Sequence, residues 1–314
     1  MSRAFVFPGQ GSQFVGMGKE LNQVFNEARE VFEEVDESLS QSLSKLMFEG
    51  PEDELLLTEN AQPAIMAVSL AIIKVLEKQG DFKISDISSF VAGHSLGEYT
   101  ALASSGSISL SDASVLLKTR GKAMQDAVPV GKGGMAALIG SDIENIEILL
   151  KQTRINGEVS AIANDNATGQ VVISGHKGSI NRAIESSREF KIRKAVLLAV
   201  SAPFHCSLME PAKQTMKNQF DIVNFKDLSL PLVANVNATA VRDFNCIKKL
   251  LIQQITGMVR WRESILYLSA NGVEEIVEVG AGKVLSGLVK RINKSILTAN
   301  IQTPDDVDRF LLNI

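Results

Sequence analysis

A serine between two glycines is the feature of this sequence best suited to covalent chemistry. Residues 93–97 read Gly-His-Ser-Leu-Gly, a G-x-S-x-G motif that follows an apolar run at 90–92 and precedes a helix-forming run at 99–103. On such a strand-to-helix turn the serine projects from the sheet, and the next N–H group points at whatever is bonded to the serine oxygen. Glycines are expected there because strand and helix approach too closely for a Cβ atom. The pattern predicts that Ser95 is a nucleophile; the alternative is an ordinary turn serine.

A serine nucleophile needs a base, usually a histidine, and the chain has only three histidines. His94 neighbours Ser95, and adjacent side chains of a strand point to opposite faces, so it is a poor base. His176 lies in a polar turn and is expected to be an exposed turn histidine. His205 lies in a loop directly after an apolar run at 192–200, where it can overhang the serine. By elimination, His205 is the predicted base.

Strand and helix patterns alternate along the rest of the chain. Residues 4–7 predict a strand that ends at Pro8, and Pro63 is expected in the first turn of an apolar helix over 64–76, where its missing N–H costs nothing. This alternation predicts an α/β protein whose α/β-hydrolase-like core has a mostly parallel sheet with helices on both faces. Other elements expected in the core are helices over 21–35, 111–127 and 284–293 and strands near 232–236 and 275–279.

The middle of the chain has a different order of elements. After the glycine-rich residues 130–134, the pattern reads strand, helix, strand, strand, helix, strand, which is the ferredoxin-like arrangement. We therefore expect a catalytic subdomain formed by residues 1–129 and 201–314 and an inserted ferredoxin-like small subdomain at 130–200. Its expected strands are 135–139, 159–163, 170–174 and 192–200, its helices 142–152 and 177–190, and its turn 164–169.

Composition excludes several classes of function. The 314 residues are 45% hydrophobic and 22% charged, which is typical of a soluble globular enzyme. A formal net charge of −4 gives no sign of nucleic-acid binding. No membrane span or signal peptide is expected, because no apolar stretch is long enough. Two cysteines are too few for a disulfide framework or a metal cluster, so we expect a cytoplasmic protein without a metal site.

Six spaced motifs together resemble the bacterial malonyl-CoA:acyl carrier protein transacylases of type II fatty-acid synthesis. The resemblance runs from residue 3 to about residue 300 and includes the inserted subdomain. Such a set over most of the chain is far more specific than one G-x-S-x-G sequence. The motifs lie at residues 7–13, 62–64, 93–99, 120–125, 169–176 and 203–205.

The resemblance implies a role for several residues. Ser95 would be the nucleophile and His205 its acid–base partner, while the backbone N–H groups of Gln10 and Leu96 would form an oxyanion hole. Arg120 would bind the substrate carboxylate, because its guanidinium fork makes two parallel hydrogen bonds with such a group. The reaction would need no metal or other cofactor. Other substrate-binding positions that the resemblance implies are Gln62, Met124, Asn164 and Phe204.

The sequence departs from the family pattern at residues 257–261, which read Gly-Met-Val-Arg-Trp where the family often has Asn-Pro-Val-Gln-Trp. In the family, a main-chain carbonyl at the Gln position orients the catalytic histidine in place of an aspartate. A main-chain carbonyl survives substitution, so Arg260 is expected to orient His205.

The resemblance also implies two partners, malonyl-CoA and acyl carrier protein. Carrier proteins are acidic and this chain is net negative, so docking needs a local basic surface. For any single basic residue, a solvated surface charge is the simpler interpretation. The candidates are Arg188, Lys191, Arg193, Lys194, Lys283, Lys290 and Arg291.

Two other functions are open at this point. A serine hydrolase, an esterase or thioesterase, would share the serine turn, but its histidine usually lies near the chain end, after an Asp or Glu. Here 109 residues follow His205. A non-enzymatic acyl-binding scaffold is disfavoured because nucleophile, base and both oxyanion positions are intact. We expect malonyl transfer to the phosphopantetheine thiol of the carrier protein.

Overall fold

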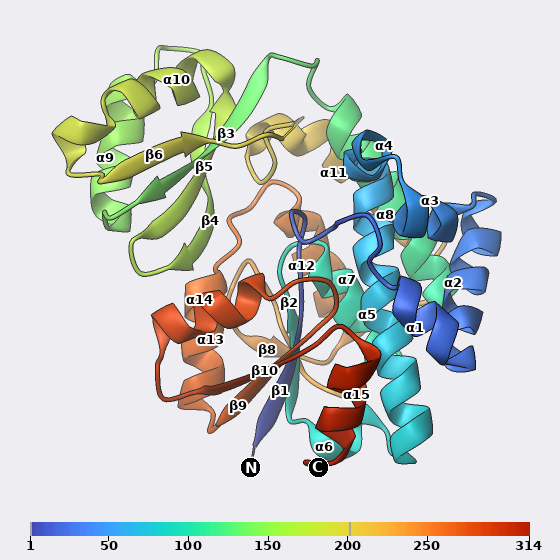
Figure 1. Cartoon of the computed structure of the whole chain (residues 1–314). Coiled ribbons are helices and arrows are strands. Elements are labelled where there is room, and N and C mark those ends of the chain that lie inside the picture. Colours follow the sequence, from blue (N-terminus) through green and yellow to red (C-terminus); the bar gives the residue numbers. More distant parts are fainter. Residues whose placement is uncertain (1, 201) are drawn as a thin grey trace.

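The computed structural model describes residues 2–200 and 202–314 and has two sheets of different size (Figure 1). The larger sheet is parallel except at one edge strand, and helices cover both of its faces. The α/β class that the sequence predicts is therefore confirmed. In spatial order its strands are β10 (Leu297–Ile301), β9 (Glu275–Val279), β1 (Arg3–Phe7), β2 (Phe90–Gly93), β7 (Leu232–Val233) and β8 (Ala240–Val241).

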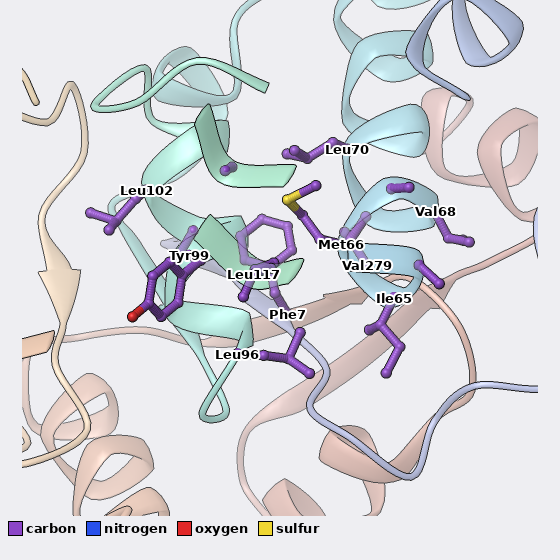
Figure 2. Close-up of a cluster of buried hydrophobic side chains, with 14 of the residues drawn as sticks. Phe7, Ile65, Met66, Val68, Leu70, Leu96, Tyr99, Leu102, Leu117 and Val279 are labelled. Carbon is purple, nitrogen blue, oxygen red and sulfur yellow. The ribbon is translucent and has the colours of Figure 1, made fainter. Parts of the chain in front are cut away.

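Strand β1 lies inside this sheet and is buried on both faces. Successive side chains of a strand point to opposite faces, so a strand covered on both sides is apolar throughout. Phe5 and Phe7 belong to the larger hydrophobic cluster, whereas Ala4 and Val6 belong to a second cluster on the opposite face that also contains Trp261. Figure 2 shows the ring of Phe7 among the side chains of the larger cluster.

The helices of this core pack against the two faces of the larger sheet (Figure 1). The helix expected over residues 21–35 is divided at Phe25, whose extended backbone interrupts the pattern. In chain order the helices are α1 (Lys19–Val24), α2 (Asn26–Leu39), α3 (Leu43–Glu49), α4 (Glu52–Leu56), α5 (Thr58–Gly80), α6 (Ile84–Ile87), α7 (Gly97–Ser104), α8 (Leu110–Asp126), α11 (Glu210–Phe220), α12 (Phe244–Gln254), α13 (Trp261–Ala270), α14 (Val284–Ile292) and α15 (Pro304–Leu311).

Helix α5 begins earlier than the sequence predicts. It starts at Thr58, so Pro63 lies inside the helix and not in its first turn, and that prediction was wrong. Tertiary contacts extend the helix, because Asn60 Nδ2 donates to the Glu54 carbonyl and Gln62 accepts from α8. The helix is long and apolar enough to cross a membrane, but 89% of its most apolar stretch is buried inside the protein. It is the central helix of the larger hydrophobic cluster.

The smaller sheet is antiparallel, and helices α9 (Ile143–Thr153) and α10 (Lys177–Glu185) pack against it over a separate cluster of buried side chains. The glycines at residues 133 and 134 belong to its first strand. The turn expected at 164–169 was also too long, because the strand continues through two irregularities to Ala167. In spatial order the strands are β4 (Ser160–Ala167), β5 (Gln170–His176), β3 (Gly133–Ile139) and β6 (Lys194–Leu197).

Strand β4 pairs with Val259, in the segment of the core that leads into α13. The Asp165 N–H donates to the Val259 carbonyl at 2.9 Å, and the Val259 N–H donates to the Ala163 carbonyl at 2.8 Å. The buried Asp165 carboxylate also pairs with Arg262 of α13 at 2.8 Å. These contacts fix the small sheet against the core at the edge where β2 ends.

Candidate active site

The serine turn is formed by β2, Ser95 and α7. Ser95 has a φ of 54°, an uncommon conformation for a residue with a side chain. A Cβ atom at Gly93 would lie 1.9 Å from the carbonyl carbon of Gly97, and one at Gly97 would lie 2.3 Å from the Phe7 carbonyl oxygen. The close approach that the sequence predicts at both glycines is confirmed. The turn therefore presents Ser95 at the end of the strand.

Ser95 and His205 are brought together from distant parts of the chain. The Ser95 Oγ lies 2.8 Å from His205 Nε2, and His205 Nδ1 lies 2.8 Å from the Gln254 carbonyl oxygen. With Nδ1 protonated, Nε2 is free to accept the serine proton. The orienting carbonyl therefore belongs to Gln254, and the prediction for Arg260 was wrong. The Arg260 carbonyl accepts from Ser264 instead, in the first turn of α13.

Burial keeps the imidazole of His205 neutral. Desolvation is the largest cause, and the nearby Arg120 cation is the second; together they lower the pKa of His205 to about 3. A neutral imidazole is the form that can accept a proton. Near neutral pH the histidine is thus ready to act as a base toward Ser95.

Arg120 lies beside the same hydroxyl and is buried. Its Nη2 donates to Ser95 Oγ at 3.0 Å and to Gln254 Oε1 at 2.8 Å, and its Nη1 donates to Gln62 Oε1 at 2.8 Å. The ring of Tyr99 lies 5.5 Å from the guanidinium carbon. Within residues 2–200 and 202–314, no carboxylate forms an ion pair with Arg120. A buried cation without a directly paired anion is unusual, because burial removes the water that would stabilise its charge.

The two positions expected to form the oxyanion hole face the same cavity. Leu96 directly follows the serine, next to the first residue of α7, and Gln10 lies in the turn after β1. Among the described residues, neither N–H group donates a hydrogen bond. Unpaired N–H groups at a helix N-terminus are suited to bind an anion.

A cavity of about 490 Å³ opens over Ser95. All four additional substrate-binding positions expected from the resemblance line it, and all four are buried: Gln62, Met124, Asn164 and Phe204. The small sheet contributes part of the wall through Met135, Ala137, Gln170 and Val172. The site thus lies between the two sheets.

The remaining histidines have other partners. His94 is half-buried, its Nε2 lies 2.8 Å from Asn166 Oδ1, and its ring packs against Trp261. His176 is half-buried and not exposed as expected, since its Nδ1 accepts from the Val159 N–H at 2.8 Å. No group of acidic, cysteine or histidine side chains suited to a metal ion occurs among the described residues.

Four residues that sequence reasoning did not place in the site surround Ser95 and its neighbours. Asn235 Oδ1 accepts from the Ser95 N–H at 2.8 Å, and the Gln254 side chain contacts Arg120. Glu98 is buried directly behind them. Of the four, only Glu98 could have been found from the sequence, because it directly follows the G-x-S-x-G motif. The four residues are Glu98, Asn166, Asn235 and Gln254.

Known proteins share both this sequence and this fold. A family model described as an acyl transferase domain matches residues 4–304. The malonyl CoA-acyl carrier protein transacylase of Bacillus subtilis is 44% identical over 97% of this chain and 95% of its own length. The Escherichia coli K12 protein of the same name is 39% identical over 96% of both chains. The chain belongs to the malonyl-CoA–acyl carrier protein transacylase family of acyl transferases.

Solved structures of the family agree with this assignment. The acyl-carrier-protein-S-malonyltransferase of Bartonella henselae superposes with a TM-score of 0.97 at 50% identity, covering 100% of this chain and 99% of that one. A malonyl-transacylase in complex with its type II PKS acyl-carrier protein superposes with a TM-score of 0.96 at 37% identity, covering 100% of both chains. The chain is therefore an acyltransferase, and the family predicted from the motifs is confirmed.

Proposed function

We propose that this enzyme transfers the malonyl group of malonyl-CoA to the phosphopantetheine thiol of acyl carrier protein through a malonyl ester on Ser95, in fatty-acid biosynthesis. The Ser95 Oγ attacks the thioester carbonyl carbon while His205 Nε2 accepts its proton. The N–H groups of Gln10 and Leu96 donate to the resulting oxyanion. When the oxyanion collapses, the C–S bond breaks, and the proton on His205 passes to the sulfur of coenzyme A.

The second half of the reaction repeats these steps in reverse order. The thiol of the carrier protein gives its proton to His205 Nε2 as its sulfur attacks the malonyl ester. Collapse of the second oxyanion returns the proton to Ser95 Oγ and releases the malonyl thioester. The hydrogen bond between His205 Nδ1 and the Gln254 carbonyl holds the same tautomer through both halves.

The buried Arg120 is the observation that carries the choice of a malonyl group. Its guanidinium contacts the nucleophile at 3.0 Å and has no carboxylate partner among the described residues. A malonyl ester on Ser95 has a free carboxylate close to its carbonyl, and that carboxylate would supply the missing charge. An acetyl group has none. Gln62, Met124, Asn164 and Phe204 would then enclose the rest of the acyl group.

A serine hydrolase is the alternative that the serine turn allows. The geometry gives it no support, because His205 is oriented by a main-chain carbonyl and not by an acidic side chain. Incubation with malonyl-CoA, with and without acyl carrier protein, separates the two. We expect malonyl-carrier protein to accumulate, with slow loss of malonate when the carrier is absent. Rapid release of malonate in both incubations would contradict the proposal.

We infer that the acidic carrier protein docks where α14 approaches the small sheet. Arg291 hydrogen-bonds Gln170, which lines the cavity, and α14 contacts β4. Reversal of charge in K290E/R291E should raise KM for carrier protein much more than KM for malonyl-CoA, whereas K78E on the distant end of α5 should change neither. Equal changes in the two KM values would mean that the carrier protein docks elsewhere. All the basic candidates are exposed: Arg188, Lys191, Arg193, Lys194, Lys283, Lys290 and Arg291.

We also propose that the chain is organised as an α/β-hydrolase-like catalytic subdomain, at 1–129 and 201–314, with a ferredoxin-like subdomain inserted at 130–200. Residues 1 and 201 lie outside the described residues. Support comes from the order β4-β5-β3-β6, with α9 and α10 as the two connecting helices. Both cysteines are free thiols, which is consistent with the expected cytoplasmic location.

A further inference from the structure

Glu98 is a buried acid that the reaction steps above do not use. It belongs to the first turn of α7, three residues after the nucleophile, and is 1% exposed. One carboxylate oxygen accepts from the Asn235 N–H at 2.9 Å, and the other accepts from Gln254 Nε2. Burial raises the pKa of Glu98 to about 7, and these two hydrogen bonds oppose the shift. The carboxylate thus contacts two residues that each reach the reacting groups.

Asn235 fixes the backbone on both sides of the serine turn. Its Oδ1 accepts from the Ser95 N–H at 2.8 Å, and its Nδ2 donates to the Gly93 carbonyl at 2.7 Å. Ser95 has a positive φ, so its backbone needs such contacts to stay in place. Glu98 anchors Asn235 through its main-chain N–H.

Gln254 contacts Ser95, His205 and Arg120, the first of them through its main chain. Its carbonyl oxygen accepts from His205, its Oε1 accepts from Arg120 at 2.8 Å, and its Nε2 donates to the Ser95 carbonyl at 2.9 Å. An amide has one acceptor end and one donor end. Oε1 must face Arg120, which only donates, so Nε2 must face acceptors. An ionised Glu98 only accepts, and it therefore permits just this orientation of the amide.

The same arrangement places a negative charge near Arg120 without occupying the donor groups of its guanidinium. Glu98 and Arg120 are joined through the neutral amide of Gln254 and form no direct ion pair. A carboxylate in direct contact would offset the cost of burying the arginine, but it would also occupy the fork that a substrate carboxylate needs. Because Gln254 separates the two residues, Glu98 provides a counter-charge while the guanidinium of Arg120 stays available to a substrate carboxylate.

We propose that Glu98 is a positioning residue for malonyl transfer, which holds Gln254 in the amide orientation that serves Arg120 and His205 and acts as the remote counter-charge of Arg120. This inference rests on the proposed function of the site. Failure of the inference can be told apart from failure of the proposed function. The function is tested on the unaltered enzyme, whereas the role of Glu98 is tested by changes relative to that enzyme.

The first test is the isosteric substitution E98Q. A glutamine can accept at one oxygen only, and its NH₂ group would face a donor, either the Asn235 N–H or Gln254 Nε2. Gln254 Nε2 then loses its charged acceptor, and the orientation of its amide rests only on Arg120 and the neutral oxygens of Ser95 and Asn235. We expect kcat/KM for malonyl-CoA to fall about tenfold to hundredfold, as for the loss of one charge-assisted hydrogen bond, and kcat/KM for acetyl-CoA to fall less. No loss, or an equal loss for both substrates, would overturn the proposal.

The exchanged pair E98Q/Q254E is the matched variant. The amide introduced at position 98 can accept from the Asn235 N–H through its oxygen and can donate through its NH₂ group to the carboxylate introduced at position 254. Arg120 then pairs directly with that carboxylate. The carboxylate at position 254 also faces the Ser95 carbonyl, which accepts from Gln254 Nε2 in the unaltered enzyme, so we expect acetyl transfer to stay reduced. KM for malonyl-CoA should stay raised at least about tenfold, because the fork of Arg120 is occupied. Full recovery of malonyl transfer would show that the separation of Glu98 from Arg120 is irrelevant.

A third measurement needs no substitution. Protonation makes Glu98 a donor, which reproduces the conflict created by E98Q. The charged or titratable groups around it are Arg120 and Tyr99, with His205 beyond Gln254. Between about pH 8 and about pH 6, around the pKa of Glu98, we expect the ratio of malonyl to acetyl acylation rates to fall. A constant ratio would contradict a role for the ionised carboxylate.

Discussion

Ser95 and His205, which are joined by a 2.8 Å hydrogen bond, also share an uncommon backbone conformation. Their φ values are 54° and 59°, in the left-handed region that residues with a side chain rarely occupy. Each such residue costs on the order of 1–3 kcal/mol and persists only where its surroundings fix it. Here Asn235 holds the Ser95 backbone, and the Gln254 carbonyl holds the His205 ring. The strain is located at the two residues that exchange a proton in the proposed reaction.

Replacement of Arg120 tests the choice of acyl group. In Arg120→Ala the malonyl carboxylate loses a buried charge-assisted contact, so kcat/KM for malonyl-CoA should fall by a factor equivalent to about 2–5 kcal/mol. The rate with acetyl-CoA should stay the same or rise. Steady-state kinetics with both substrates measure the two effects. If both rates fall by the same factor, Arg120 has a structural role only.

Replacement of Phe204 tests steric exclusion. Its ring is buried and lines the cavity next to His205, and we expect it to fill the space that an α-methyl branch of the substrate would need. Phe204→Ser should therefore admit methylmalonyl-CoA and leave malonyl transfer largely intact. The measurement is kcat/KM for both thioesters. A variant that still rejects methylmalonyl-CoA would show that another group sets the limit.

The dependence of stability on pH should reveal the buried neutral His205. Its folded-state pKa, about 3, lies below its ordinary value of 6.5. Its contribution to stability is therefore present above about pH 6.5 and is lost as the pH falls toward 3. Glu98 acts in the opposite direction, because its pKa is raised from 4.5 to about 7.

A comparison with His205→Asn isolates the histidine from Glu98. Urea unfolding of both proteins, measured between about pH 4 and about pH 7, should show that the unaltered protein loses more stability on acidification, on the order of 1.4 kcal/mol per unit of pKa difference. Parallel curves would mean that His205 is not buried as a neutral group.

Gly93→Ala tests the packing of the serine turn. The added methyl group would lie within 2.0 Å of the Gly97 carbonyl, so the strand or the helix must move. We expect a loss of about 1–3 kcal/mol or more in the free energy of unfolding, together with loss of acylation. Gly287→Ala in α14 is the control, because nothing lies within 4 Å of the new methyl group and alanine favours a helix. Equal free energies of unfolding for the two variants would refute the close approach of Gly93 to Gly97.

The residues of the serine turn were predictable because their chemistry is local. A glycine is required at Gly93 by the nearby Gly97 and at Gly97 by the Phe7 carbonyl of the adjacent strand, and both requirements appear in the sequence as one short motif. The α/β class follows for the same reason, since alternation of strands and helices is a local pattern. Ser95 and His205 could be paired by elimination, because the chain has so few histidines.

The partners of these residues were not predictable. Every residue has a main-chain carbonyl, so nothing in the side chains distinguishes Gln254 from Arg260 as the group that orients His205. The roles of Asn235 and Glu98 arise from contacts between segments more than 130 residues apart. The prediction that Pro63 lies in the first turn of its helix was wrong for a similar reason. Tertiary contacts to Gln62 extend α5 beyond its apolar pattern.

The most direct test of the account is to locate the covalent intermediate. Incubation with malonyl-CoA alone, followed by acid quenching and peptide mass spectrometry, should find a single malonyl group on the peptide that contains Ser95. Addition of acyl carrier protein should remove this group and yield the malonyl-carrier product, and Ser95→Ala should form no adduct. A malonyl group on another residue, or transfer that persists in Ser95→Ala, would contradict the account.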